Sequence, residues 1–589
     1  MSNPEDEKDQ HDRLVRDAQV LAALAVLFGS VRLLHQTPWW VGVAVLVAGA
    51  VLLRPRIVVV ALVLLLAARA CAALDGLEPT ATGPVDQSEV VLVSDPESST
   101  TGWTGEGRLG EDRVWLSVQF GAGINVGEVA MGDSLIISGT LRGEAPDNSW
   151  EISRRLVGRV SVTEVHAHRS ARGPIGIANQ VRAIYRDGVS HMSFEDRALF
   201  TGLLFGDDRN QDPIDADNFR AAGLGHLLAV SGQNVVFVLL LAAPLLGRVR
   251  SVWVRVVLSL VVLVGFGFLT RFEASVLRAL VMAGLVLVAH GVGREASASP
   301  VLVPAVVGLL LFDPLLGWSL AFQLSVAATV GMVVLAPRVA GLVPGPEGLG
   351  LAVGATLGAQ VFVSPLILSV FGGLSLVAVP ANLLAGPAAA GVMMWGLVAG
   401  LVAGVVPCWV AVVVHWPTSV LLWWVRWVAG VFGRVEVGHF SVWHLVVVLC
   451  GLGVLLWPDA GLWVRRVGVV LVVLSVGSAL VVPRSLGPGV YEFGDGVVVV
   501  RSEEFVDVVV LESGVRVGDA LELLRSARLG RVDLLVANGT SREMGLVVHV
   551  LSERFEIETI WAPVGHNVPG AYARTDLAET LSALGVARE

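Results

Sequence analysis

The chain has 589 residues, of which 54% are hydrophobic and 16% are charged, with a formal net charge of −10 and a mean hydropathy of +0.72. Soluble domains carry about a quarter charged residues, so this composition excludes an ordinary soluble protein and indicates a polytopic α-helical membrane protein. Its 41 basic residues include a single lysine, Lys8 in the polar leader, which excludes a Walker A loop and a pyridoxal Schiff base.

The first 76 residues predict a cytoplasmic leader and three membrane helices. The leader, 1–17, is polar and acidic, and apolar segments follow near 18–34, 39–53 and 57–74. The leader lacks the basic start and the small-residue cleavage site of a secretory signal, so we expect a retained anchor. The positive-inside rule assigns the basic turn 54–56 to the cytoplasm, which puts residue 75 outside.

Residues 77–170 predict a small external β domain, because about five segments alternate apolar and polar residues between turn-forming residues. Arginines lie among tryptophans here, a combination with which a small barrel can stack bases and neutralise phosphates. The candidate contacts to a nucleic-acid strand are Trp103, Arg113, Trp115, Arg142 and Arg154. The alternative is that the aromatic residues fill the core of the domain beneath a solvated charged face.

Residues 171–221 are amphipathic and mixed in charge, which predicts helices that lie at the membrane interface. Apolar segments resume over 222–483 and predict about ten further membrane helices, or about 13 in the chain. The arginine-containing loops 248–255 and 465–466 are expected in the cytoplasm, which leaves both soluble domains outside. Gly396, Gly400 and Gly404 recur every four residues and predict a close helix-packing face.

Residues 484–589 predict a short α/β domain. Strand-like segments such as "DVVVLES" and "RVDLLVAN" enclose the helix-like "GDALELLRSARLG", and "EIETIWAP" follows a second helical pattern. Strands that alternate with helices in this way are typical of an α/β fold.

Three long stretches resemble the competence domain of ComEC-type DNA-uptake channel proteins. They are "ALFTGLLFGDDRN…FRAAGLGHLLAVSGQNV", "FDPLLGWSLAFQLSVAATVGM" and "GATLGAQVFVSPLILSVFGGLSLVAVPANLLAGP", in the family's order. The resemblance covers roughly 20–480 and includes the external domain, which is OB-like in this family. It implies a channel in the cell membrane (the bacterial inner membrane) that carries one strand of transforming DNA into the cytoplasm. It also implies two partners, a DNA-receptor protein and a cytoplasmic ATPase or helicase that supplies the drive.

One position pair departs from the family. The opening stretch usually continues "SGLHV", whereas this chain has "SGQNV", so Gln233 and Asn234 replace an apolar residue and a histidine. The change keeps polarity but removes a titratable group. A pathway that depends on the proton of that histidine is therefore in doubt here.

Polar side chains within the apolar segments are the candidates for a translocation path, because a bilayer interior penalises such groups unless they have a partner or a function. On one continuous helix, His226, Gln233 and Asn234 would share a face. The alternative for each residue is a hydrogen bond from helix to helix, although a mid-span arginine usually faces water or an anion. The candidate path residues are His226, Ser231, Gln233, Asn234, Arg278, Gln323, Gln360 and Asn382.

The C-terminal domain of many family members resembles a metallo-β-lactamase-like hydrolase with an HxHxDH cluster after a strand. Here the corresponding place reads "ANGTSREMGL", and the domain's histidines are His549 and His566. A hydrolytic zinc site needs at least three protein ligands. We therefore expect a degenerate domain with no catalytic residues, no metal and no cofactor, in a protein that is not an enzyme.

Two other functions stay open at this point. The chain could transport another anionic polymer or a lipid-linked molecule, or it could be a membrane scaffold that conducts nothing. Base-stacking aromatic residues on the external domain would favour DNA, whereas buried tryptophans would favour the alternatives.

Overall fold

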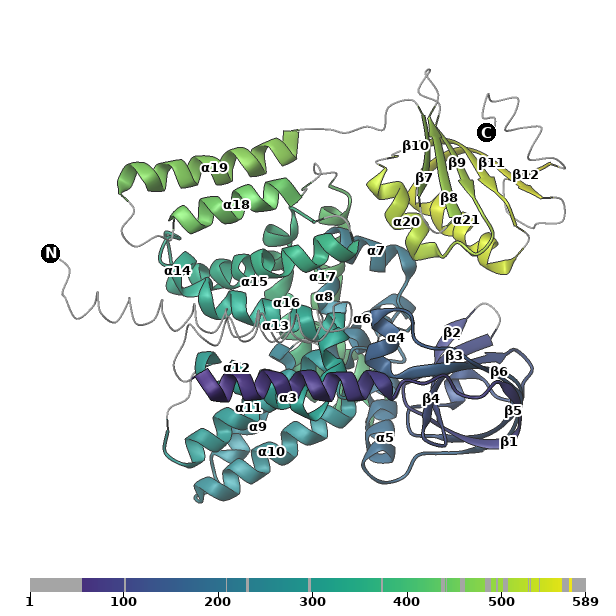
Figure 1. Ribbon diagram of the computed structural model, residues 1–589, viewed down its shortest axis with the longest axis horizontal. Coiled ribbons are helices and arrows are strands. Elements are labelled where there is room, and N and C mark those ends of the chain that lie inside the picture. The colour runs from purple at the N-terminus through teal and green to yellow at the C-terminus, as the bar shows by residue number, and fades with distance from the viewer. Residues whose placement is uncertain are drawn as a thin grey trace. The chain divides into compact units, whose positions relative to one another are not determined.

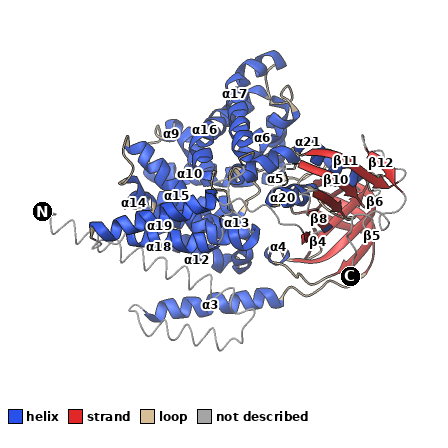
Figure 2. Ribbon diagram, turned by 90° about the horizontal axis from the view of Figure 1, so that it is seen from above, coloured by secondary structure: helices blue, strands red, loops and turns tan. Residues whose placement is uncertain are grey.

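The computed structural model describes residues 56–574 apart from 100–101, 208, 229–231, 295–297, 372–373, 436–439, 441, 456–460, 482–488, 494–495, 502–506, 528, 530, 540 and 564–570. Helices make up most of the chain, and the strands fall into two separate sheets (Figure 2). The chain forms two compact units. The first contains the residues up to Arg209 with His226–Val363 and Ala389–Leu422, and the second contains Asn210–Gly225, Ser364–Ala388 and the residues from Trp423 onward. The predicted helices 18–34 and 39–53 lie outside the described residues.

A six-stranded sheet forms the β domain of the first unit. The strand order is β1-β5-β6-β4-β3-β2, and an additional pairing of β1 with β3 joins five of the strands into a closed cycle. All neighbours are antiparallel except β4 and β6, which are parallel. The strands are β1 (Gly83–Leu92), β2 (Glu97–Ser99), β3 (Gly102–Leu109), β4 (Asp112–Gln119), β5 (Ser134–Gly143) and β6 (Leu156–Arg169).

Alternation along these strands builds the core of the β domain. On β4, Val114, Leu116 and Val118 are buried, while the residues between them are partly exposed. That is the two-residue period of a strand with one face on a core. The short helices η1 (Val126–Glu128) and α4 (Ser149–Arg154) complete the domain. We did not predict α4, whose N-terminus is capped by Asn148 accepting from Glu151 N at 2.9 Å.

Helices occupy most of the chain between Arg56 and Gly433. They are α3 (Arg56–Asp75), α5 (Gly173–Gly188), α6 (Phe194–Phe205), α7 (Pro213–Ala221), α8 (Gly225–Leu228), α9 (Gly232–Leu246), α10 (Val252–Leu269), α11 (Ala274–Gly291), α12 (Ala298–Phe312), η2 (Pro314–Trp318), α13 (Leu320–Val334), α14 (Ala336–Ala340), α15 (Glu347–Phe371), α16 (Ala378–Ala403) and α17 (Cys408–Gly433).

Five helices in the described part of the chain are long and apolar enough to cross a membrane: α10, α11, α15, α16 and α17. The predicted number of about 13 is not confirmed. It treated every apolar run as a full span, whereas α9, α12 and α13 contain 15 residues each. A perpendicular span of about 30 Å needs about 20 residues.

The long helices expose large apolar side chains on one face. On α10 these are Trp253, Val257, Val261 and Val264, spaced three or four residues apart. Contiguous apolar surfaces of this kind are rare on soluble monomers. Lipid tails are the solvent that suits them, so the helices indicate a multi-pass membrane protein.

The predicted glycine face of α16 is confirmed as a packing surface. A methyl group on Gly400 would lie 2.3 Å from Cδ1 of Tyr185 on α5, and one on Gly404 would lie 2.2 Å from the Ile184 carbonyl oxygen. Such distances leave no room for a side chain. The Tyr185 hydroxyl donates to the Leu397 carbonyl at 2.5 Å, which fixes α5 against this face.

The second unit ends in the predicted small α/β domain. Its sheet has the order β12-β11-β10-β9-β8-β7, in which β9 to β12 are parallel to one another and β7 and β8 add antiparallel strands. Helices α20 and α21 pack on the sheet (Figure 1). The elements from α18 onward are α18 (Val442–Leu455), α19 (Leu462–Val481), β7 (Gly489–Phe493), β8 (Val497–Arg501), β9 (Asp507–Leu511), α20 (Val517–Ser526), β10 (Arg531–Ala537), α21 (Arg542–Arg554), β11 (Glu556–Pro563) and β12 (Ala571–Arg574).

Candidate functional site

Arg278 lies where three helices of the first unit meet, and its side chain is 7% exposed. It belongs to α11, and its Nε donates to Ser325 Oγ of α13 at 2.8 Å. Its Nη1 donates to Met282 Sδ, one turn along its own helix, at 3.1 Å. Gly232 at the start of α9 is the third neighbour, since a methyl group there would lie 3.2 Å from Nη2. We call this place the Arg278 junction.

The Arg278 junction contains a cation without a counter-charge. Within the described ranges no carboxylate contacts the guanidinium, whose hydrogen-bond partners are a hydroxyl and a thioether. A buried charge without an opposite charge is costly, and within membrane helices such residues mark ion or substrate pathways. The guanidinium is therefore a buried cation with no opposite charge beside it in the described part of the chain.

Two predicted path residues near these helices make structural hydrogen bonds. Asn234 of α9 is buried, and its Nδ2 donates to the Leu203 carbonyl of α6 at 2.9 Å. Gln323 of α13 is also buried, and its Nε2 donates to the Gly317 carbonyl at 2.7 Å. The bond of Asn234 is the helix-to-helix alternative of the sequence analysis, whereas Gln323 bonds to the turn η2 that directly precedes its own helix.

The structure separates the other predicted path residues. His226 lies on α8 and Gln233 on α9, and both are exposed. The prediction that they share one face of a single continuous helix is therefore wrong. Gln360 is half-buried on α15. Asn382 belongs to the second unit and donates to the Ala378 carbonyl of its own helix at 2.7 Å. Ser231 lies outside the described residues.

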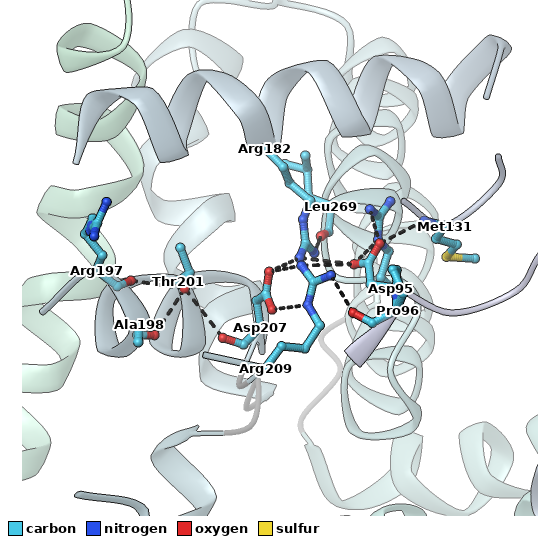
Figure 3. Close-up of polar contacts among 11 residues, drawn as sticks. Asp95, Pro96, Met131, Arg182, Arg197, Ala198, Thr201, Asp207, Arg209 and Leu269 are labelled. Carbon is cyan, nitrogen blue, oxygen red and sulfur yellow. Dashed lines mark hydrogen bonds and ion pairs between the residues drawn. The ribbon is translucent and has the colours of Figure 1, made fainter. Parts of the chain in front are cut away.

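A buried ionic cluster lies where the β domain meets the helices of the first unit, and we did not predict it (Figure 3). Asp95 accepts from both Nε and Nη2 of Arg271, at 3.0 and 2.9 Å, and lies 3.2 Å from Arg182 Nη2. Asp207 accepts from Arg182 Nη2 at 2.7 Å and pairs with Arg209. We call these five side chains the ionic cluster. Arg182 connects its two halves, because it contacts both Asp95 and Asp207.

The ionic cluster joins segments that are far apart in the chain. Asp95 follows β1 in the β domain, Arg182 is on α5, and Asp207 and Arg209 follow α6. Arg271 follows α10 in the left-handed backbone region, with a φ of 59°. Backbone groups complete the bonding: the carbonyls of residues 96 and 269 accept from arginines, and the amide of residue 131 donates to Asp95. The cluster thus fastens the β domain to α5, α6 and α10.

Charge pairing sets the protonation states of the ionic cluster. Burial alone would raise the pKa of Asp95, but Arg182, Arg271 and Arg209 outweigh it and hold the pKa well below its usual value. The pKa of Asp207 is lowered in the same way, against burial, by Arg209 and Arg182. Both carboxylates are therefore ionised at any physiological pH, and each of their oxygens accepts at least one hydrogen bond.

The β domain corrects part of the predicted strand-binding surface. Trp103 is 3% exposed within the core, so the prediction that it stacks bases is wrong. Its ring packs in the core cluster of the domain together with Leu116 and Val118 of β4. Trp115 packs edge-on against Trp150, with ring centroids 5.3 Å apart. The Arg154 guanidinium lies 4.7 Å from the centroid of the Trp150 ring and pairs with Glu106, so its charge is already compensated.

Two arginines of the predicted surface differ in their availability. Arg113 is partly buried and donates to the Arg154 carbonyl at 3.5 Å, and burial lowers its pKa. Arg142 on β5 is exposed. Of the five predicted contacts, Arg142 is therefore the one whose charge is most open to a phosphate.

Metal ligands are not gathered anywhere in the described residues, where no group of three or more His, Cys, Asp or Glu side chains has the geometry to hold an ion. His549 is exposed on α21, 3.6 Å from Glu553, and His566 lies outside the described residues. His168 of the β domain pairs with Asp133 at 2.8 Å.

Comparison with known proteins gives one match. No curated protein and no solved structure matches the chain significantly. A family model described as "Competence protein" matches residues 203–461. That segment contains the Arg278 junction and, from the ionic cluster, Asp207, Arg209 and Arg271. Residues 203–461 are thus similar to the competence proteins, and they carry the buried, uncompensated arginine of a multi-pass membrane chain.

Proposed function

We propose that this protein carries single-stranded DNA across the cell membrane into the cytoplasm during natural transformation. The match of residues 203–461 to competence proteins and the apolar helices support a membrane protein of DNA uptake in general. The observation that carries the finer proposal is the Arg278 junction. Complementation of a competent strain that lacks its own channel, with surface-bound and internalised labelled DNA scored separately, tests it.

The chemistry of the Arg278 junction fits a phosphodiester strand. A guanidinium presents a planar fork of donors that matches two phosphate oxygens. One such group within a bilayer lowers the cost of each passing phosphate without binding the strand permanently. The serine and thioether partners of Arg278 are neutral, so an arriving phosphate displaces no carboxylate.

The β domain fits a receiving surface for the strand. Its closed cycle of five strands supports an OB-like barrel, a fold that commonly binds single strands. In this proposal the barrel is external, a receptor protein delivers DNA to it, and a cytoplasmic ATPase or helicase pulls the strand. The drive is assigned to a partner because the lone lysine of the chain, Lys8, forms no Walker A loop.

A first prediction concerns this surface. Residues 77–170, which have their own core, should bind a single strand weakly and lose affinity steeply as salt rises. Arg142→Ala should weaken binding and reduce the slope of log affinity against log salt by about 0.7, because one phosphate contact is lost. Arg154→Ala is the matched control and should change the slope less, since Glu106 already compensates that charge. Fluorescence anisotropy in a salt series measures both, and a slope unaffected by Arg142→Ala would contradict the assignment.

The burial of Trp103 favours a second candidate, a transporter of an anionic polymer that reads no bases. Stacking on aromatic rings distinguishes nucleic acid from a chain of phosphates alone. In the same assay, inorganic polyphosphate that competes as well as a DNA strand of equal charge would favour this second candidate.

The C-terminal domain is proposed to be a metallo-β-lactamase-like remnant that docks and does not hydrolyse. Asp217 of α7 pairs with Arg525 of α20, and Arg554 Nε of α21 lies 3.7 Å from its other carboxylate oxygen. Arg554 Nη2 also donates to the Gly433 carbonyl at 3.5 Å, and Ile214 of α7 packs on the core of the domain. Helix α7 immediately precedes α8, which carries His226. Docking of the C-terminal domain on α7 therefore fixes the segment that leads to this predicted path residue.

A second prediction tests this docking by exchanging charges. Asp217→Arg places a third cation beside Arg525 and Arg554 and should lower the free energy of unfolding by about 3–5 kcal/mol, as loss of one partner from a buried pair does. Adding Arg525→Asp should restore part of the loss. Chemical denaturation of the full chain in detergent measures both effects. The control is Glu553→Arg, an exposed reversal on α21, and equal losses in the single and double variants would contradict the docking.

A further inference from the structure

A histidine is buried without full bonding where α5, α6, α16 and α17 pack together. His415 of α17 is 0% exposed, and its Nδ1 lies 3.1 Å from Thr418 Oγ1. Its Nε2 is buried and has no hydrogen-bond partner among the residues described. A titratable group inside a membrane helix with an unsatisfied nitrogen is a candidate for a functional role.

A second histidine faces the first. His191 lies in the turn after α5, and its ring centroid is 5.8 Å from that of His415. Phe200 of α6 packs edge-on against His415 with centroids 5.4 Å apart. Of the titratable groups on the packed elements, His191 is the one that acts on His415 by charge; Tyr185 donates its hydroxyl elsewhere, to the Leu397 carbonyl.

The helix around His415 is already loosened. Pro417 lies inside α17 and has no amide proton to donate, so one backbone carbonyl of the previous turn loses its partner. Side chains donate to carbonyls at this place: Trp395 Nε1 of α16 to residue 414 at 3.0 Å, and Ser419 Oγ to His415 at 3.2 Å. A small change in charge here acts on a turn of the helix that lacks one backbone hydrogen bond.

We propose that His415 and His191 form a proton-binding site, and that protonation loosens the packing of α5 and α6 on α16 and α17. Neutral rings fit the packed state, whereas a proton on the buried His415 ring or on the half-buried His191 ring has no carboxylate partner among the residues described. A second proton would add repulsion between two cations whose ring centroids are 5.8 Å apart. The proposal stands independently of what the protein transports.

The direction of the pH effect follows from the burial. Burial lowers the pKa of His191, and the Gly188 carbonyl opposes this only in part. The loosened state has the ordinary histidine pKa of about 6.5. The packed state is therefore fully stable above that pH, and its stability falls as pH drops below it. The carboxylates of the ionic cluster, which also hold α5, titrate below about pH 4 and do not interfere in this window.

Hydrogen exchange of the full chain in nanodiscs, followed by mass spectrometry at pH 7.5 and 5.5, tests the site. After correction for intrinsic rates, amides of α5 and α6 should exchange up to about tenfold faster at pH 5.5 in the wild type. His415→Gln, which keeps an acceptor for Thr418, should abolish this acceleration, and His191→Gln should reduce it.

The exposed His549→Gln is the matched control and should leave the acceleration intact. If His415→Gln does not fold, the half-buried His191→Gln still decides the matter. A wild type without acceleration, or an acceleration that persists in His191→Gln and in any folded His415 variant, would overturn the proposal.

Discussion

Replacement of Arg278 with leucine should stop DNA uptake while leaving the protein at least as stable as the wild type. The guanidinium is buried without a counter-charge, so its removal relieves a desolvation cost. Replacement of a residue kept only for packing would show the opposite pattern: the protein would lose stability, and uptake would fall only as far as the amount of folded protein falls. Loss of activity together with retained stability is characteristic of a functional site that is maintained at a cost to the fold.

Uptake should fall to background in Arg278→Leu, and DNA bound at the surface should remain. Arg278→Lys should keep part of the uptake, because the charge remains while the planar fork does not. Arg294→Leu is the matched control, an exposed arginine in the turn after the same helix. Label scored outside and inside complemented cells, with denaturation midpoints of the purified variants, measures both properties. Wild-type uptake in Arg278→Leu would make this arginine structural.

Local patterns in the sequence predicted the separate parts of the fold well. The strand-like run "RVDLLVAN" predicted β10, and the four-residue glycine spacing predicted that Gly400 faces another helix. Both signals are local, because each is carried by residues that are close together in the sequence. The arginine of α11 was also identifiable, since a charge within an apolar run is conspicuous without knowledge of its partners.

Features that depend on distant partners were not predictable. Nothing near Asp95 indicates that Arg182 and Arg271, 87 and 176 residues away, lie beside it. The stretch "GDDRN" carries part of the family resemblance, and nothing in it indicates that its Asp207 pairs with Arg182 and Arg209. The composition of the β domain did leave the burial of Trp103 open, as the alternative that its aromatic residues fill the core. Helix α4 could not be predicted, because it is only six residues long, is capped by a single asparagine and follows turn-forming residues after β5.

Asp95→Asn should separate the β domain from the helices of the first unit. The ionic cluster then contains three arginines and one carboxylate, that of Asp207. It has lost the carboxylate to which Arg271 donates from two nitrogens. An amide offers one acceptor oxygen and no charge, so buried cations remain that repel one another. Loss of one partner from a buried ion pair costs about 3–5 kcal/mol, and two arginines depend on this one. Limited proteolysis should release the β domain as a fragment from the variant and leave the wild type intact.

Acid should produce the same separation in the wild type, in a defined pH range. Because the pKa of Asp95 and that of Asp207 are lowered in the folded protein, their contribution is complete above about pH 4 and is lost as pH falls further. Asp95→Asn should therefore show less dependence on pH below about 4 than the wild type. Asp86→Asn is the matched control on the same domain, where an exposed oxygen accepts from the Ser138 hydroxyl and an amide oxygen can do so equally. Resistance of Asp95→Asn to proteolysis at neutral pH, equal to that of Asp86→Asn, would show that apolar packing and not the ionic cluster holds the domain in place.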